Sequence, residues 1–193
     1  MPRRALVVVV VLALLVVLIG GSVASTYNAL IGLDQDVQGQ WAQVETAYQR
    51  RADLIPNLVE TVKAAAAHER DTLVTVTEAR ARVGGLPSGA GLAEFQAAQD
   101  QLSSALGRLL AVAEAYPQLR ANENFLALQS QLEGTENRIA VERRRYNDAA
   151  RAFNTRRDSF PTVVIAGAFG ERFAEKPYFA AQAGAAEAPK VKF

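Results

Sequence analysis

The stretch ALVVVVVLALLVVLIGGSVA, residues 5–24, decides how the whole chain is interpreted, because it contains no charged residue. With a rise of about 1.5 Å per residue, a helix of about 20 residues spans roughly 30 Å, the thickness of a bilayer's hydrocarbon core. The sequence therefore predicts a transmembrane helix. A cleavable secretory signal is the alternative, since Ser22-Val23-Ala24 resembles a small-x-small cleavage site. The length of the apolar core favours an uncleaved anchor.

The charges on either side of this stretch predict its orientation. Arg3 and Arg4 precede it, whereas the first charges that follow it are acidic, Asp34 and Asp36. No Lys or Arg follows it before Arg50. Because basic flanks stay on the cytoplasmic side, we expect a cytoplasmic N-terminus and a body outside the cytoplasm.

The composition excludes several classes of partner and site. The chain has 21 Lys and Arg residues against 20 Asp and Glu, so a nearly neutral body offers no bulk attraction to nucleic acid. With no cysteine, the sequence contains no disulfide framework and no thiolate chemistry. We expect no nucleic-acid partner.

Helical periodicity continues beyond the anchor. From Tyr27 to Arg51, apolar residues recur on two adjacent stripes, which predicts that one helix crosses the bilayer and enters the body. Pro56 follows Asp53, a suitable N-cap, so we expect a hairpin here and a second helix to about Val83. A single helix kinked at Pro56 is the alternative.

Two further helices follow the glycine-rich loop of residues 84–91. The third is predicted from Leu92 to about Ala115 and ends at Tyr116-Pro117. The fourth, from about Gln118 to Asp158, carries apolar residues at seven-residue intervals, typical of a coiled coil: Phe125, Leu132, Ile139, Tyr146, Phe153 and Phe160.

Together these signals predict an all-α protein whose transmembrane helix continues into an antiparallel up-and-down four-helix bundle. The expected parts are the N-terminus and anchor (residues 1–26), the bundle (27–159), and an apolar C-terminal segment with a flexible tail (160–193). Because the fourth helix returns towards the bilayer, the segment after it should lie near the membrane surface. It either caps the bundle or contacts lipid or a neighbouring subunit, through Phe160, Val163, Val164, Ile165, Phe169, Phe173 and Phe179.

The sequence matches no familiar catalytic or metal-binding pattern. His68 is the sole histidine, so the sequence lacks the paired Glu-x-x-His of di-iron bundles, the zinc protease motif and a Ser-His triad. Gly84-Gly85 and Gly89-x-Gly91 match no phosphate-binding loop. We therefore predict no enzyme activity, no catalytic residue, no metal and no cofactor.

Arg51, Asp53 and Asn57 lie at the expected first helical junction, with Arg51 close to the apolar stripe, and allow two interpretations. They either tie the first helical junction, with Arg51 pairing an acid, or line a polar pocket for a small ligand. Since buried polar groups need partners, the structural interpretation alone accounts for them.

Several motifs resemble the LemA family. The longest is RRADLIPNLVETVK from Arg50 to Lys63, which includes Pro56. The others are HER (His68–Arg70), YPQLRANENF (Tyr116–Phe125, beginning at Tyr116 and Pro117), RYN (Arg145–Asn147), Phe153-Asn154, Phe160-Pro161 and the ending Pro189–Phe193. Ala180 departs from the pattern, since family members often carry an acidic residue there. The resemblance implies a bacterial membrane protein with an N-terminal anchor and an antiparallel four-helix body, and no accepted enzymatic activity.

Two hypotheses of function follow. The first is a self-associating structural or scaffolding component of the bacterial cytoplasmic (inner) membrane, a single-pass homo-oligomer in contact with the lipid bilayer. The second is an extracytoplasmic adaptor or ligand-binding module for an envelope protease or a signalling partner.

Overall fold

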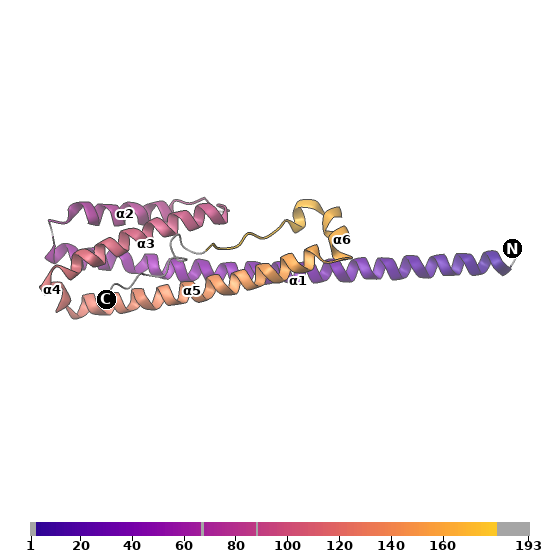
Figure 1. Ribbon diagram of the computed structural model, residues 1–193, viewed down its shortest axis with the longest axis horizontal. Coiled ribbons are helices and arrows are strands. Elements are labelled where there is room, and N and C mark those ends of the chain that lie inside the picture. Colours follow the sequence, from indigo (N-terminus) through magenta and orange to yellow (C-terminus); the bar gives the residue numbers. More distant parts are fainter. Residues whose placement is uncertain (1–2, 67, 88, 181–193) are drawn as a thin grey trace, which may run out of the picture. The chain divides into compact units, whose positions relative to one another are not determined.

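The structure is a computed structural model that describes residues 3–66, 68–87 and 89–180. Over these residues it is helical and contains no strand, which confirms the all-α class. The helices are α1 (Arg3–Ala65), α2 (Arg70–Gly84), α3 (Leu92–Glu114), α4 (Pro117–Arg120), α5 (Glu123–Asp158), α6 (Thr162–Ala168) and the short 3₁₀ helix η1 (Gly170–Phe173) (Figure 1).

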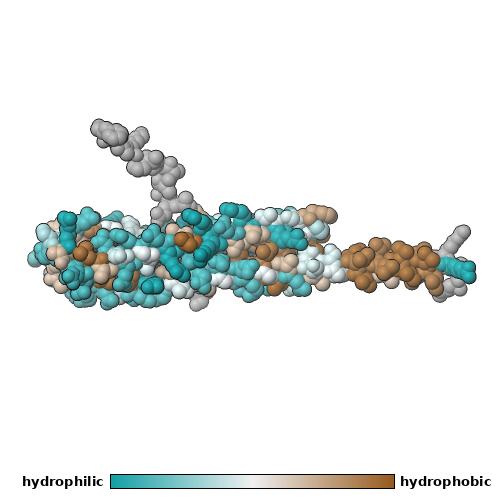
Figure 2. Space-filling view, turned by 90° about the horizontal axis from the view of Figure 1, so that it is seen from below, coloured by the Kyte–Doolittle hydropathy of each residue, from teal (hydrophilic) through white to brown (hydrophobic). Residues whose placement is uncertain are grey.

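The N-terminal part of α1 is apolar and unburied. Every described side chain from Leu6 to Ser25 is exposed, and burial begins at Thr26. Figure 2 shows most of this stretch as hydrophobic surface. It is also long and apolar enough to cross a membrane. A helix that is apolar all round is stable in lipid rather than in water, so this stretch indicates a single-pass membrane anchor.

The hairpin expected at Pro56 is wrong. Helix α1 runs without a break to Ala65, with Pro56 in its interior, and the next helix, α2, begins only at Arg70. A proline inside a helix removes the N–H that would bond to the carbonyl four residues earlier, here that of Ala52. Arg80 of α2 supplies the missing donor, since its Nε lies 3.1 Å from the Ala52 oxygen.

This substitute donor leads to a prediction about two residues far apart in the sequence. Arg80→Ala should lower the free energy of unfolding by up to about 1 kcal/mol, since it leaves the Ala52 carbonyl without a protein donor. In a Pro56→Ala background the residue-56 N–H bonds to that carbonyl, and the same substitution should have almost no effect. Urea unfolding of the two single variants and the double variant measures this coupling; equal effects in both backgrounds would contradict it.

The chain packs into two compact units, and α1 and α5 each contribute to both. The first unit contains residues up to Ala42 and Arg145–Lys176; the second contains Gln43–Arg144 and the described residues from Pro177 to Ala180. The predicted domain boundaries at residues 26 and 159 stay a prediction. Of the predicted C-terminal part, residues 160–193, the structure describes residues 160–180, and the predicted flexible tail from Ala180 onward lies otherwise outside the described residues.

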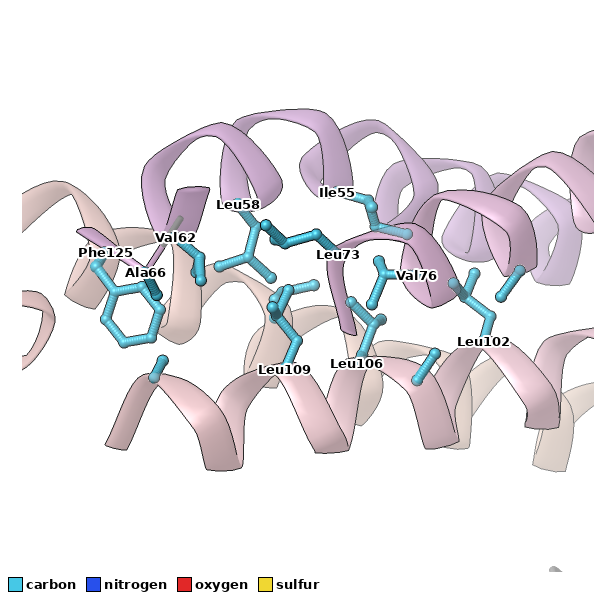
Figure 3. Packing of buried hydrophobic residues seen from close by; sticks show 14 of the residues in the cluster. Ile55, Leu58, Val62, Ala66, Leu73, Val76, Leu102, Leu106, Leu109 and Phe125 are labelled. Carbon is cyan, nitrogen blue, oxygen red and sulfur yellow. The ribbon is translucent and has the colours of Figure 1, made fainter. Parts of the chain in front are cut away.

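The hydrophobic core of the second unit draws on all its helices. Leu58 and Val62 of α1 face Leu73 and Val76 of α2, and Leu106 belongs to the row that α3 contributes (Figure 3). Leu119 of α4 and two residues of α5 complete the cluster, Phe125 and Leu132. Within this unit the chain reverses direction after α1, after α2 and at α4 (Figure 1). The complete up-and-down bundle stays a prediction.

The core of the first unit is largely aromatic. The Tyr27 ring of α1 lies 4.9 Å from the Phe169 ring and 5.4 Å from the Phe173 ring, and Phe173 also packs against Phe153 of α5. Further along the same two helices, the rings of Trp41 and Tyr146 meet edge to face at 5.6 Å. Edge-to-face aromatic pairs are favourable beyond the area they bury. The segment of α6 and η1 is therefore packed against α1 and α5.

The seven-residue stripe of α5 is a core stripe. Its five members inside the helix are buried: Phe125, Leu132, Ile139, Tyr146 and Phe153. Phe160, expected to continue it, follows the end of α5 and is 83% exposed. The stripe therefore packs inside this chain.

Candidate functional site

Two charged residues of α1 lie on the buried face of the helix, among its apolar side chains. Leu30, Val37, Val44 and Leu58 are spaced by multiples of seven, and Arg51 falls in the same series. A parallel series of Trp41, Tyr48, Ile55 and Val62 begins with Asp34. The side chains of Arg51 and Asp34 are 1% and 2% exposed. Buried charges need partners, so each defines a polar cluster inside one unit.

The guanidinium group of Arg51 connects three helices of the second unit. Its Nη1 donates to Glu136 Oε1 of α5 at 2.6 Å and to Ser103 Oγ of α3 at 2.7 Å. Its Nη2 donates to Gln99 Oε1 of α3 at 2.6 Å. The planar fork of arginine suits such divergent bonding, which a lysine could not reproduce. Glu136 is half-exposed, so one side of this cluster reaches solvent.

Aromatic rings complete the Arg51 cluster. The guanidinium carbon lies 5.0 Å from the centroid of the Tyr48 ring, within reach of a cation–π contact, and Tyr48 packs edge to face on Phe95. Burial raises the pKa of the Tyr48 phenol, and the nearby positive charges of Arg143 and Arg51 act in the opposite direction. Tyr48 therefore stays neutral at neutral pH. The Arg51 Nε is buried and has no hydrogen-bond partner.

The Asp34 cluster holds the C-terminal segment of the first unit. Lys176 Nζ lies 2.6 Å from Asp34 Oδ1, Gln38 Nε2 donates to Oδ2 at 2.8 Å, and Arg172 Nη1 lies 3.8 Å from Oδ2. The backbone of Lys176 is held as well: its N–H donates to Asn154 Oδ1, and its carbonyl accepts from Asn154 Nδ2, both at 2.9 Å. One carboxylate and one amide thus fix this segment to α1 and α5.

Asp34→Ala should loosen the attachment of residues 169–176. Removing a buried carboxylate leaves Lys176 without its ion pair, which should destabilise the attachment by about 2 kcal/mol, less than for a fully buried pair because Lys176 is partly exposed. Tryptic cleavage after Arg172 should accelerate. Glu175→Ala is the matched control, since it removes an equal charge from an exposed side chain. Equal cleavage rates in the two variants would contradict the role of Asp34 in attaching residues 169–176.

The model of the LemA family matches residues 40–193, a range that holds the Arg51 cluster and all of α2 to η1. The chain belongs to the LemA family. It is 29% identical over 179 residues to the magnetosome proteins MamQ 1 and MamQ 2 of Paramagnetospirillum magneticum. It is 28% identical to the magnetosome protein MamQ of Magnetospirillum gryphiswaldense. The match covers 78% of this chain and 65% of each relative.

The LemA-family motif around Arg51 lies along a helix and not at a junction. Asp53 is exposed and accepts a hydrogen bond from Gln49 at 2.8 Å, as an interior helical residue and not as an N-cap. Asn57 is exposed, and its backbone carbonyl accepts from Thr61. Arg51 alone of the three points into the core. The three residues therefore line no common pocket.

The second LemA-family motif does lie at a junction. Pro117 is the first residue of α4, where its missing N–H is not needed, and Tyr116 is the N-cap. The Tyr116 hydroxyl donates to Glu69 Oε1 at 3.1 Å, and this hydrogen bond raises the pKa of the phenol. Glu69 is the N-cap residue of α2, so Tyr116 ties the α3–α4 junction to the α1–α2 turn. His68 is exposed in that turn.

The seven C-terminal residues expected to contact lipid or a subunit divide into two groups. Phe160, Val163, Val164 and Phe169 are exposed, and Ile165 is half-buried. Phe173 and Phe179 are buried, Phe173 against Tyr27 and Phe153 and Phe179 beneath the guanidinium of Arg143. The last two therefore offer no exposed side chain for such a contact, which corrects the expectation for them.

Sequence reasoning missed Asp34, Gln99, Ser103 and Glu136. A charge at a seven-residue position of an apolar seam was the signal that could have found Asp34. The other three lie on helices that the chain brings to Arg51 only after folding. The Ser103 hydroxyl accepts from Arg51 and donates to the Gln99 carbonyl at 3.1 Å, so its proton is already engaged. The cluster is arranged to join helices. Among the described residues, no group of three or more His, Cys, Asp or Glu could hold a metal ion.

Proposed function

We propose that this protein is a self-associating structural component of the bacterial cytoplasmic membrane, with a helical body on the outer side and no catalytic role. The observation that carries the proposal is the continuity of α1, which passes from the apolar anchor into the core of the body without an intervening loop. A linker would separate the body from the bilayer; a continuous helix suits a protein that holds its partners at the membrane.

Charge and packing support the finer features of this proposal. The basic residues before the anchor and the acidic ones after it favour a cytoplasmic N-terminus and an extracytoplasmic body. The reversals of chain direction and the shared core favour an antiparallel up-and-down four-helix bundle for the body. The named relatives are magnetosome proteins, and with the LemA family they suggest a membrane-associated helical protein.

Self-association requires a surface that the chain itself leaves uncovered. The seven-residue stripe of α5 is buried, so an intermolecular coiled coil would not use it. Val74 of α2 and Leu126 and Val141 of α5 are large apolar side chains that remain exposed. We propose these as contacts between copies, the lipid bilayer being the other partner of the protein.

The mass of the intact particle after gentle extraction in a mild detergent tests the proposal. A uniform particle of several copies supports self-association. In the double variant Val74→Ser with Val141→Ser, the measured mass should shift towards that of a monomer. A monomer in both the membrane and the extract would contradict the proposal. Crosslinking in intact membranes before extraction controls for dissociation by detergent.

An adaptor for an envelope protease or a signalling partner is the second candidate. A groove of about 480 Å³ between α1 and α2 favours it, because apolar Val59, Leu73 and Val74 line it together with charged residues such as Lys63 and Glu78. Apolar side chains bordered by polar ones are typical of a protein-binding surface. A foreign protein in fixed stoichiometry with this chain in the extracted particle would support this candidate over the first.

A further inference from the structure

The C-terminal segment of the first unit presents an apolar surface that no part of the described chain covers. In α6, Thr162 and Ala166 face inward and are 0% and 5% exposed, whereas Val164 is 65% exposed. Val163 lies beside Val164, and an exposed phenylalanine flanks the helix at each end. We call this surface, made of Phe160, Val163, Val164 and Phe169, the α6 apolar face.

The α6 apolar face lies next to the point where α1 leaves its apolar stretch. Phe169 contacts the ring of Tyr27 at 4.9 Å, and Tyr27 follows Ala24, the last residue of that stretch, by three positions. On a helix three positions are about 4.5 Å. All of these residues belong to one compact unit, so their relative placement is that of a packed core. Figure 1 shows α6 beside α1 in this region.

The side chains around this point suit the boundary between lipid and water. Tyrosine is enriched at that level, since its ring is apolar and its hydroxyl is polar. Arg172 follows the α6 apolar face and is 48% exposed, so its guanidinium can meet a lipid phosphate. The exposed side chains of this short helix are apolar and an arginine follows them, which suits contact with a membrane surface.

We propose that α6, with Phe160 and Phe169, inserts its apolar face into the headgroup–acyl boundary of the bilayer that holds the anchor. The inference rests on the proposed membrane anchoring of α1 and adds a second lipid contact to it. Lipid is the occupant favoured over a second copy, because the face is adjacent to the end of the surface that lipid covers. Through its contact with Tyr27, the segment would fix how deeply α1 sits in the bilayer. The Asp34–Lys176 ion pair would hold the segment against α1.

Tryptophan fluorescence in vesicles tests this proposal on the full-length chain. The sequence contains one tryptophan, Trp41, which lies 14 positions after Tyr27, or about 21 Å further along α1. In phosphatidylcholine–phosphatidylglycerol vesicles with brominated acyl chains, native Trp41 should therefore keep its emission. In a Trp41→Phe background, Val164→Trp and Phe160→Trp should each lose emission to the brominated lipid, and Leu15→Trp should lose it as well. Circular dichroism verifies that each variant keeps its helix content.

The three positions distinguish the inference from the anchor. If tryptophans at positions 15, 160 and 164 all lose emission to the brominated lipid, the result supports both the anchor and the second lipid contact. Loss at 15 alone, with 160 and 164 quenched by aqueous acrylamide, overturns the inference and leaves the anchor standing. Emission at 160 and 164 that neither bromolipid nor acrylamide quenches overturns it too, because a protein surface then covers the face. No loss at 15 overturns the anchor and the inference together.

Discussion

Arg51→Ala is expected to destabilise the helical body by about 3 kcal/mol, which corresponds to a fall in Tm of about 6–12 °C. The substitution removes a buried guanidinium and leaves the buried Gln99 side chain without the donor 2.6 Å from its oxygen. An unsatisfied buried polar group costs about 1–3 kcal/mol, and the lost packing on Tyr48 adds to this. Thermal or urea unfolding followed by circular dichroism measures the change.

Glu136→Gln is the matched control for that experiment. Glu136 accepts from the same guanidinium at 2.6 Å, yet half of its side chain is exposed. Glutamine keeps an acceptor oxygen and lacks only the charge, which water already screens, so the loss should be under about 1 kcal/mol. If the two variants unfolded at the same denaturant concentration, the burial of Arg51 would not explain its contribution to the stability of the body.

Two carboxylates in the anchor should abolish membrane integration. Each aspartate near the middle of a transmembrane helix costs about 2.5–3.5 kcal/mol of insertion free energy, so Val11→Asp with Leu15→Asp costs roughly 5–7 kcal/mol. Both native side chains are exposed, so the body loses no packing. The protein should move from the alkaline-washed membrane pellet to the soluble fraction or be degraded.

Val11→Ala with Leu15→Ala controls for the change in side-chain size at the same positions. Alanine is compatible with the hydrocarbon core, so this variant should stay in the pellet. An aspartate variant that also stayed there would show that the stretch does not serve as the membrane span.

The helical class, both bounds of α3 and the ends of α2 and α5 were predictable because they depend on local signals. The predicted third helix, Leu92 to about Ala115, differs from α3 by one residue, since a glycine-rich loop and Tyr116-Pro117 bound it. The buried stripe of α5 was predictable for the same reason, up to Phe153.

The turn after α1 could not be predicted from local signals. Pro56 after Asp53 is a good helix start, and residues 64–67 are alanines, which favour helix. What keeps α1 helical through Pro56 includes the Arg80 bond to the Ala52 carbonyl, from a side chain 24 positions after Pro56. A tertiary contact therefore offsets the local signal at Pro56, and no local signal marks the end of α1 at Ala65.

The polar clusters were predictable only in part. Arg51 was expected to lie near the apolar stripe and to pair with an acid, and it does pair with Glu136. Its partners, however, come from α3 and α5, and no local pattern connects these residues. Likewise, nothing near Phe173 in the sequence distinguishes a ring that packs on Tyr27 from one that contacts lipid.

The central claim is that the apolar stretch remains attached to the body as a permanent anchor continuous with α1. Mass spectrometry of the intact protein recovered from alkaline-washed membranes tests it most directly. We expect a chain of 20.8 kDa in the membrane fraction. A shorter chain that begins near Ser25 and is recovered in the soluble fraction would contradict it.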